Sequence, residues 1–229
     1  MKIALCILTF NELNGCKNDI SLISMDKFDE VYAVDGGSTD GTIDYLTSMG
    51  IPIYIQPKPG YNAAYIHAFE KCHSEALVLF HPKGSIHPSE LQKFRHFFNT
   101  GYDLVIASRN IRGARNEEDK KLLKPRKWFV MGLALLSAVL WKREGNFIWD
   151  VLHGLRGVRK DKFFDMDPLD NGLSIDLELV VRSYKKQLNR IEFPVREYPR
   201  SIGTTHFKAL PTGAKLLKYI FIELYRKDL

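Results

Sequence analysis

The sequence is poor in cysteine, with three in 229 residues, at positions 6, 16 and 72. Such an odd, sparse set excludes the small secreted proteins that disulfides hold together, and it suits a reducing compartment. We also expect no signal peptide, because the apolar run at 3–8 is short and no small-residue cleavage site follows it. We therefore expect a cytoplasmic protein.

Long hydrophobic runs are absent as well. The strongest candidate is the segment 128–141, WFVMGLALLSAVLW. As a helix it would be about 21 Å long, against a hydrocarbon core of roughly 30 Å, so it is too short to span a membrane. Two interpretations stay open: a buried helix, or a helix lying on the inner surface of a membrane with a tryptophan at each end and basic residues on both flanks.

Composition indicates a packed core and an excess of positive charge. Hydrophobic residues make up 45% and charged residues 26%, as in a soluble globular protein. The net charge of +6 favours anionic partners such as phosphates, nucleotides or an acidic membrane surface. Nucleic acid is not expected, because the basic residues form no recognition module with exposed aromatic residues. Nothing in the sequence indicates an oligomeric state.

Short apolar runs alternate with stretches of helical character. Strand-length runs lie at 3–8, 31–34, 51–55, 76–80 and 104–107, and helical stretches at 14–26, 40–49, 61–73 and 88–98. Runs that are apolar on both faces are typical of a parallel sheet covered by helices. The pattern predicts an α/β fold with a mostly parallel central sheet flanked by helices. A helix at 174–186, a strand at 190–195 and an amphipathic helix at 213–227 follow.

The loops after the strands are where ligands bind in such a sheet. The first reads TFNE at 9–12 and the second DGGSTDGT at 35–42. Asp35 can accept hydrogen bonds from ribose hydroxyls or a base N–H, and the glycines let a ligand approach the backbone. A tight turn with an ordinary helix cap explains the second loop equally well.

Several segments, in this order, resemble the family 2 glycosyltransferases of the GT-A fold. They are LTFNE, VDGGSTDGT, GYNAAYIHAF at 60–69, GYDLVIASR at 101–109, DVLHGLR at 150–156 and RIEFPVREYPRSIG at 190–203. The last group points to the dolichyl-phosphate mannose synthase-like branch, whose acceptors are polyprenyl phosphates. The resemblance covers residues 1–207. It implies one GT-A domain, 1–229, with a nucleotide-binding half at 1–109 and an acceptor-binding half at 110–229.

The activity that the resemblance implies is inverting hexosyl transfer from a UDP- or GDP-sugar to an acceptor, a polyprenyl phosphate at the membrane surface. We expect Asp150, Lys83 and Arg109 to be catalytic; the resemblance implies Asp150 and Arg109, whereas Lys83 lies in a loop that departs from the family. Lys83 and Arg109 would also contact the nucleotide-sugar, together with residues after the first two strands: Thr9, Phe10, Glu12, Asp35 and Gly37.

The acceptor side depends on the second half of the chain. Asp150 stands where the family keeps an acid near the sugar, and it would take the proton of a hydroxyl acceptor. Arg200 would meet a phosphate, and Thr205 and His206 occupy the places of a Ser-Lys pair in the resembled branch. Simpler interpretations are surface ion pairs for Arg109 and Arg200, and a helix cap for Asp150.

The loop after the fourth strand departs from the family. GT-A enzymes usually carry Asp-x-Asp there, which holds Mg²⁺ or Mn²⁺ against the leaving diphosphate. Here the tripeptide is His81-Pro82-Lys83, so we expect no metal cofactor. Three interpretations follow: Lys83 replaces the metal, the chain is a catalytically inactive nucleotide-binding or partner subunit, or Lys83 points into solvent. The acidic segment 114–121 is expected to be a solvated flap, although its acids would also suit a metal.

Overall fold

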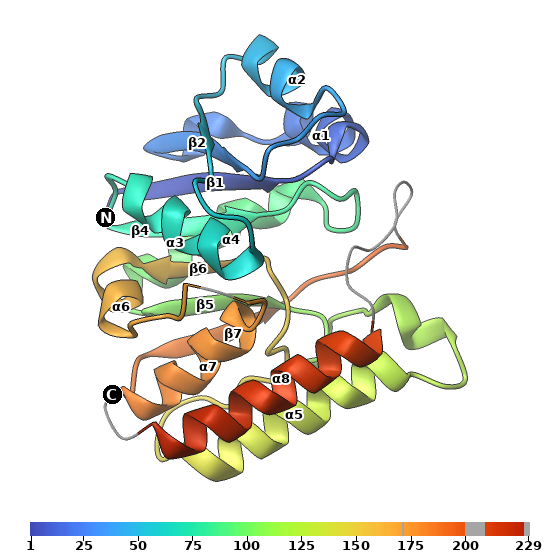
Figure 1. The fold of residues 1–229 in the computed structure, drawn as a ribbon, viewed down its shortest axis with the longest axis vertical. Coiled ribbons are helices and arrows are strands. Elements are labelled where there is room, and N and C mark those ends of the chain that lie inside the picture. The colour runs from blue at the N-terminus through green and yellow to red at the C-terminus, as the bar shows by residue number, and fades with distance from the viewer. Residues whose placement is uncertain (171, 200–208, 227–229) are drawn as a thin grey trace.

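The computed structural model describes residues 1–170, 172–199 and 209–226. Within them a seven-stranded sheet has the order β3-β2-β1-β4-β6-β5-β7 (Figure 1). Its strands are β1 Ile3–Thr9, β2 Glu30–Asp35, β3 Ile53–Ile55, β4 Ala76–Phe80, β5 Leu104–Ser108, β6 Arg156–Arg159 and β7 Arg190–Pro194. β6 runs antiparallel between β4 and β5, and the other pairs are parallel. The predicted α/β fold is confirmed.

Helices cover both faces of this sheet. One face packs against α1 Leu13–Asp19, α2 Thr42–Ser48 and α4 Lys93–Asn99. The other packs against α3 Tyr61–Lys71, α5 Pro125–Trp141, α6 Lys160–Asp165, α7 Ile175–Lys185 and α8 Ala209–Tyr225. Side chains alternate along a strand, so β1 contributes to the hydrophobic core on each face of the sheet. Ala4, Cys6 and Leu8 face α3, while Ile3, Leu5 and Ile7 face α1.

β6 is the strand that the sequence pattern did not reveal. Its residues, RGVR, contain two arginines and a glycine instead of an apolar run. The strand forms because β4 and β5 hydrogen-bond to it on both sides. Gly157 is needed there, because an added Cβ would lie 2.7 Å from the Phe98 ring.

α5 and α8 lie side by side along the lower edge of the molecule in Figure 1. Gly213 of α8 packs closely on Phe129 of α5, with 3.3 Å from an added Cβ to the ring. Both helices bury one face and leave large apolar side chains exposed on the other, among them Leu135, Leu136, Val139, Leu217, Phe221 and Tyr225. Within the described residues, no helix is both long enough and apolar enough to cross a membrane.

The loop after β4 is held against α1. At Gly15 an added Cβ would lie 1.8 Å from the backbone carbonyl oxygen of Pro82. The buried Asp19 carboxylate accepts the backbone N–H of Gly84 at 2.8 Å. The position of His81-Pro82-Lys83 therefore depends on the small size of residue 15.

Gly15→Ala should destabilise the protein by about 1–3 kcal/mol, because the new methyl group overlaps the Pro82 carbonyl. Urea unfolding measures this change. Gly132→Ala in α5 is the control, since no atom lies within 4 Å of its added Cβ and alanine favours a helix. An unchanged free energy of unfolding for Gly15→Ala would contradict the close packing of α1 on the loop.

Candidate functional site

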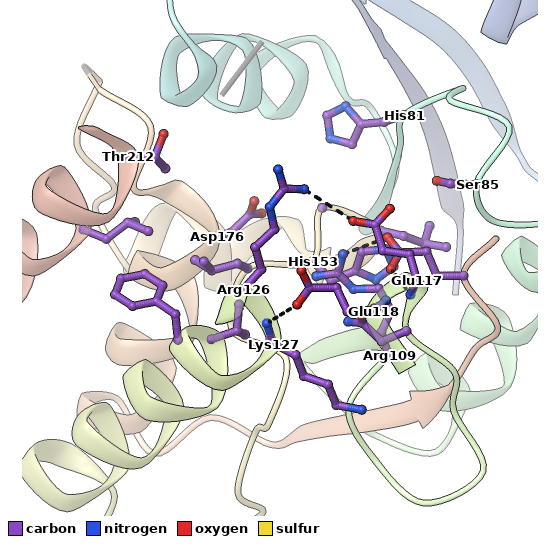
Figure 2. A pocket seen from close by; sticks show the side chains of 18 of the residues that line it. His81, Ser85, Arg109, Glu117, Glu118, Arg126, Lys127, His153, Asp176 and Thr212 are labelled. Carbon is purple, nitrogen blue, oxygen red and sulfur yellow. Dashed lines mark hydrogen bonds and ion pairs between the residues drawn. The ribbon is translucent and has the colours of Figure 1, made fainter. Parts of the chain in front are cut away.

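A cavity of about 840 Å³ opens between the carboxyl edge of the sheet and the helices α5 and α8 (Figure 2). The wall formed by the strand ends, their loops and the start of α7 carries the polar side chains His81, Lys83, Arg109, His153, Asp176 and Glu197. On the side of α5 and α8, Phe129, Val130, Leu216 and Leu217 form an apolar wall, and Arg126 and Lys127 in the first turn of α5 add two cations beside it. The cavity can therefore hold a ligand that is charged at one end and apolar at the other.

Arg109 and Asp150 form a buried ion pair beside this cavity. Arg109 follows β5, and its Nε and Nη2 donate to the two oxygens of Asp150 at 2.9 and 3.0 Å. Its Nη1 donates to Glu197 at 2.9 Å. Asp150 is fully buried, and Arg109 is 17% exposed, so neither a surface ion pair nor a helix cap describes them.

The charge state of Asp150 follows from this pairing. Burial alone would raise the pKa of Asp150, but the attraction and hydrogen bonds of Arg109 outweigh it and hold the pKa at about 2. The carboxylate does not line the cavity, and Glu192 of β7 binds its backbone N–H at 2.7 Å. This geometry favours a positioning role, in which Asp150 holds Arg109 in place. It disfavours a role for Asp150 as a base that contacts the acceptor.

A second polar cluster lies at the end of β4. Tyr61 and Tyr65, one turn apart on α3, donate to Asp176 at 3.0 and 2.9 Å. Asp176, in the first turn of α7, pairs with the fully buried Arg156 at 3.0 Å. Nε2 of His81 lies 3.3 Å from the Tyr61 oxygen.

Sequence reasoning missed most of this cluster. Tyr61 and Asp176 line the cavity, but no motif singled them out. The available signals were the i, i+4 spacing of Tyr61 and Tyr65 on one helix face and the acid at the start of a predicted helix. His153 was missed too. Burial, followed by the Arg109 charge, lowers the pKa of His153 to about 4, so its ring is neutral at pH 7.

The nucleotide-binding residues expected after β1 and β2 lie at the carboxyl ends of these strands and do not line the cavity. They meet at neighbouring strand ends: Asp35 accepts from the Thr9 hydroxyl at 2.6 Å and from the Gly37 N–H at 2.8 Å. Phe10 is 47% exposed, and the backbone N–H of Glu12 donates to a threonine hydroxyl. Arg200, Thr205 and His206 lie outside the described residues. Of the predicted set, Lys83 and Arg109 line the cavity itself.

The acidic segment 114–121 is part of the cavity wall, so the expectation of a solvated flap is wrong for its central residues. Glu117–Lys120 form a 3₁₀ turn, η4. Glu118 is buried and accepts the backbone N–H of Lys127 at 3.1 Å. Glu117 pairs with Arg126 at 3.4 Å across the cavity mouth, as Figure 2 shows. These contacts fasten the segment to the first turn of α5.

The donor set of the cavity limits how a metal could bind. No cluster of three histidine, cysteine or acidic side chains suitable for an ion occurs in the part of the chain that the structure describes. Asp176 and Glu197 are engaged by protein donors, and His81 adds an imidazole at the β4 end. In phosphate chemistry, divalent ions often take one or two protein ligands and complete their shell with phosphates and water. The described lining could therefore supply one or two ligands to such an ion, with phosphates and water completing its shell.

Comparison with known proteins identifies the family. The family model described as "Glycosyl transferase family 2" matches residues 5–164. Among curated proteins of Haloferax volcanii, glycosyltransferase AglJ is 28% identical, over 98% of this chain and 72% of its own. The dolichyl-phosphate hexose transferase is 29% identical, over 95% and 92%.

Solved structures show the same fold. Glucosyl-3-phosphoglycerate synthase from Mycobacterium tuberculosis, crystallised with Mn²⁺, UDP and phosphoglyceric acid, gives a TM-score of 0.75 at 16% identity, covering 99% of this chain and 80% of that one. A second structure of that enzyme, with Mg²⁺ and UDP, gives 0.71 at 13% identity, covering 99% and 80%.

These structures correct the expectation that the site takes no metal cofactor. The similar GT-A enzyme was crystallised with Mn²⁺ or Mg²⁺ beside UDP, and the lack of Asp-x-Asp in this chain does not outweigh that finding. The interpretation of Lys83 as a replacement for the metal is withdrawn with it. With the family model covering most of the chain and the fold in agreement, this protein belongs to glycosyl transferase family 2 and is a glycosyltransferase with the GT-A fold.

Proposed function

We propose that this protein transfers a hexose from a UDP-sugar to a polyprenyl phosphate at a membrane surface, with a divalent cation at the diphosphate and inversion at the sugar carbon. The observation that carries the proposal is the cavity with one polar and one apolar wall. UDP is chosen over GDP because UDP occupies the similar solved structures. A lipid phosphate is chosen because a similar curated protein is a dolichyl-phosphate hexose transferase.

The donor lies, in this proposal, along the carboxyl edge of the sheet. Nucleobase and ribose bind near Phe10 and Asp35, and the diphosphate reaches Lys83 at the cavity. When bound, the divalent cation neutralises charge on the departing diphosphate. Lys83 adds a charge-assisted hydrogen bond to the same oxygens. Arg109, held by Asp150, faces the sugar with the N–H groups that its carboxylate partners leave available.

The acceptor completes a single displacement. An oxygen of the polyprenyl phosphate bonds to the anomeric carbon as the bond to the diphosphate breaks, and the electron pair leaves with UDP. A phosphate monoester is largely ionised at neutral pH, so no general base is needed. This agrees with an Asp150 that is already ionised and bound to Arg109.

The lipid part of the acceptor accounts for the apolar wall. α5 and α8 supply that wall and expose further apolar side chains outward, such as Val139 and Phe221. Lysines 215 and 218 on α8 and the basic residues 142 and 143 after α5 would attract an anionic membrane surface. A protein seated there would draw the acceptor from the bilayer into the cavity.

Transfer should require both a UDP-hexose and a divalent ion. We expect radiolabelled sugar from a UDP-hexose panel to appear on a short polyprenyl phosphate with Mn²⁺ or Mg²⁺, and EDTA to abolish the product. GDP-hexoses serve as the comparison donors. Transfer to 3-phosphoglycerate but not to the lipid phosphate would overturn the acceptor assignment, and full activity in EDTA would overturn the metal.

Asp150→Asn should lower kcat more than it raises KM, because the amide leaves Arg109 with a weaker partner. Breaking a buried pair costs about 3–5 kcal/mol of stability, so unfolding is measured in parallel and kinetics are read below the transition. Asp150 is ionised at any working pH, so kcat/KM of the native protein should show no acid limb from this group between pH 5 and 8. An acid limb that disappears in Asp150→Asn would show that Asp150 is the base after all.

Val139→Asp and Phe221→Asp should each reduce binding to anionic vesicles about tenfold or more, because burial of a large apolar side chain contributes roughly 1.5–3 kcal/mol. Sedimentation with phosphatidylserine-containing vesicles at low salt measures this. Leu22→Asp is the matched control: Leu22 is 53% exposed but lies on the α1 side of the sheet. Equal losses in all three variants, or no binding by the native protein, would contradict a membrane face at α5 and α8.

A further inference from the structure

His153 is held from two sides at the polar wall of the cavity. Its backbone carbonyl accepts hydrogen bonds from Nε and Nη2 of the fully buried Arg156, at 3.0 and 2.6 Å. Its ring contacts the backbone carbonyl of Ala107, in β5, through Nδ1. The side chain lines the cavity on the same wall as Arg109 (Figure 2). The protein itself therefore fixes both the main chain and the ring of this residue.

The contact with Ala107 decides which ring nitrogen carries the proton. A backbone carbonyl oxygen can accept a hydrogen bond but cannot donate one, so Nδ1 of His153 is the donor. Burial, followed by the charge of Arg109, lowers the pKa of His153 to about 4, so the ring holds a single proton at neutral pH. The other ring nitrogen, Nε2, therefore carries a lone pair and acts as an acceptor.

This lone pair is accessible from the cavity. Within residues 1–170, 172–199 and 209–226, the ring makes its hydrogen bond through Nδ1, and Nε2 is not among the buried polar atoms that lack a partner. Because His153 lines the cavity, a ligand in the cavity can reach Nε2. An acceptor in this position requires a ligand atom that carries hydrogen.

The ligands proposed for the cavity offer one kind of hydrogen donor there. The diphosphate and the phosphate monoester are largely ionised at neutral pH and present acceptor oxygens. The polyprenyl chain has no polar hydrogen, and the nucleobase was placed near Asp35, away from the cavity lining. The hydroxyl groups of the hexose remain. A sugar hydroxyl donates one hydrogen bond and accepts others, which matches an accepting His153 and a donating Arg109 on one wall.

We propose that His153, through Nε2, accepts a hydrogen bond from one hydroxyl group of the transferred hexose and so determines which donor sugars the protein uses. The proposal rests on the proposed function for the presence of a UDP-hexose. A donor without that hydroxyl would remove water from the fixed lone pair and leave it without a partner. We expect such a donor to react about tenfold more slowly in kcat/KM.

Two variants separate recognition of the sugar from support of the fold. His153→Asn keeps an N–H near the position of Nδ1 for the Ala107 carbonyl, but its side chain ends short of Nε2. His153→Gln reaches as far as Nε2 and can present an amide oxygen there as an acceptor. Calorimetry with Mn²⁺ measures binding of UDP and of the UDP-hexose. We expect His153→Asn to bind UDP like the native protein and the UDP-hexose several-fold more weakly, whereas His153→Gln retains part of the sugar affinity.

Deoxy donors identify the hydroxyl group. The kcat/KM of transfer is measured with the 2-, 3-, 4- and 6-deoxy forms of the UDP-hexose that the native protein uses. One of these changes should cost the native protein about tenfold and His153→Asn nothing further, while the other three cost both proteins equally. His96→Ala, an exposed position on α4 outside the cavity lining, is the control and should match the native protein throughout.

Equal losses in the native protein and His153→Asn for all four deoxy donors would overturn the proposal and leave the proposed function intact. So would a fall in UDP binding by His153→Asn as large as the fall in UDP-hexose binding, because that would assign the residue a structural role. A native protein that neither binds nor transfers sugar from any UDP-hexose would refute the proposed function, and this inference with it.

Discussion

The buried pair of Arg109 and Asp150 joins the two halves of the chain at the place where the sheet offers its ligand-binding edge. Arg109 directly follows β5, and the backbone N–H of Asp150 donates to Glu192 of β7. Because Asp150 is fully buried, its charge is tolerated only with the guanidinium in place. The path of the chain from α5 to β6, and with it one side of the cavity, depends on this contact.

The two-sided character of the cavity follows from the topology. β6 inserts between β4 and β5, which brings Gly154 and His153 beside the end of β4. α5 and α8 then close the far side with apolar residues, while the acidic segment at η4 ties the start of α5 to the polar wall. The proposed transfer from a charged donor to an amphipathic acceptor needs both characters within one cavity.

The sequence predicted the parallel strands well, because buried strands carry continuous apolar runs such as those of β1 and β4. Two of the residues that it singled out, Lys83 and Arg109, line the cavity, and their catalytic and donor-binding roles stay predictions. The strand β6 was not predicted, because its own residues carry no strand pattern. Pairing with β4 and β5 makes it a strand. The expectation of no metal rested on a motif that asks for two carboxylates in one loop, whereas an ion shared with a diphosphate needs fewer protein ligands. Asp176 was not predicted as a site residue, because packing of α7 on α3, and not proximity in the sequence, brings it to the end of β4.

The central claim is that the departing diphosphate binds where the loop after β4 meets the cavity. A crystal structure with UDP and Mn²⁺, with data collected at the manganese absorption edge, tests it most directly. We expect the manganese anomalous peak at the diphosphate, with Lys83 on the same diphosphate and uracil near Asp35. A diphosphate seated against the apolar wall of α5 and α8, or in the smaller hollow beside Asp19 and His87, would contradict it.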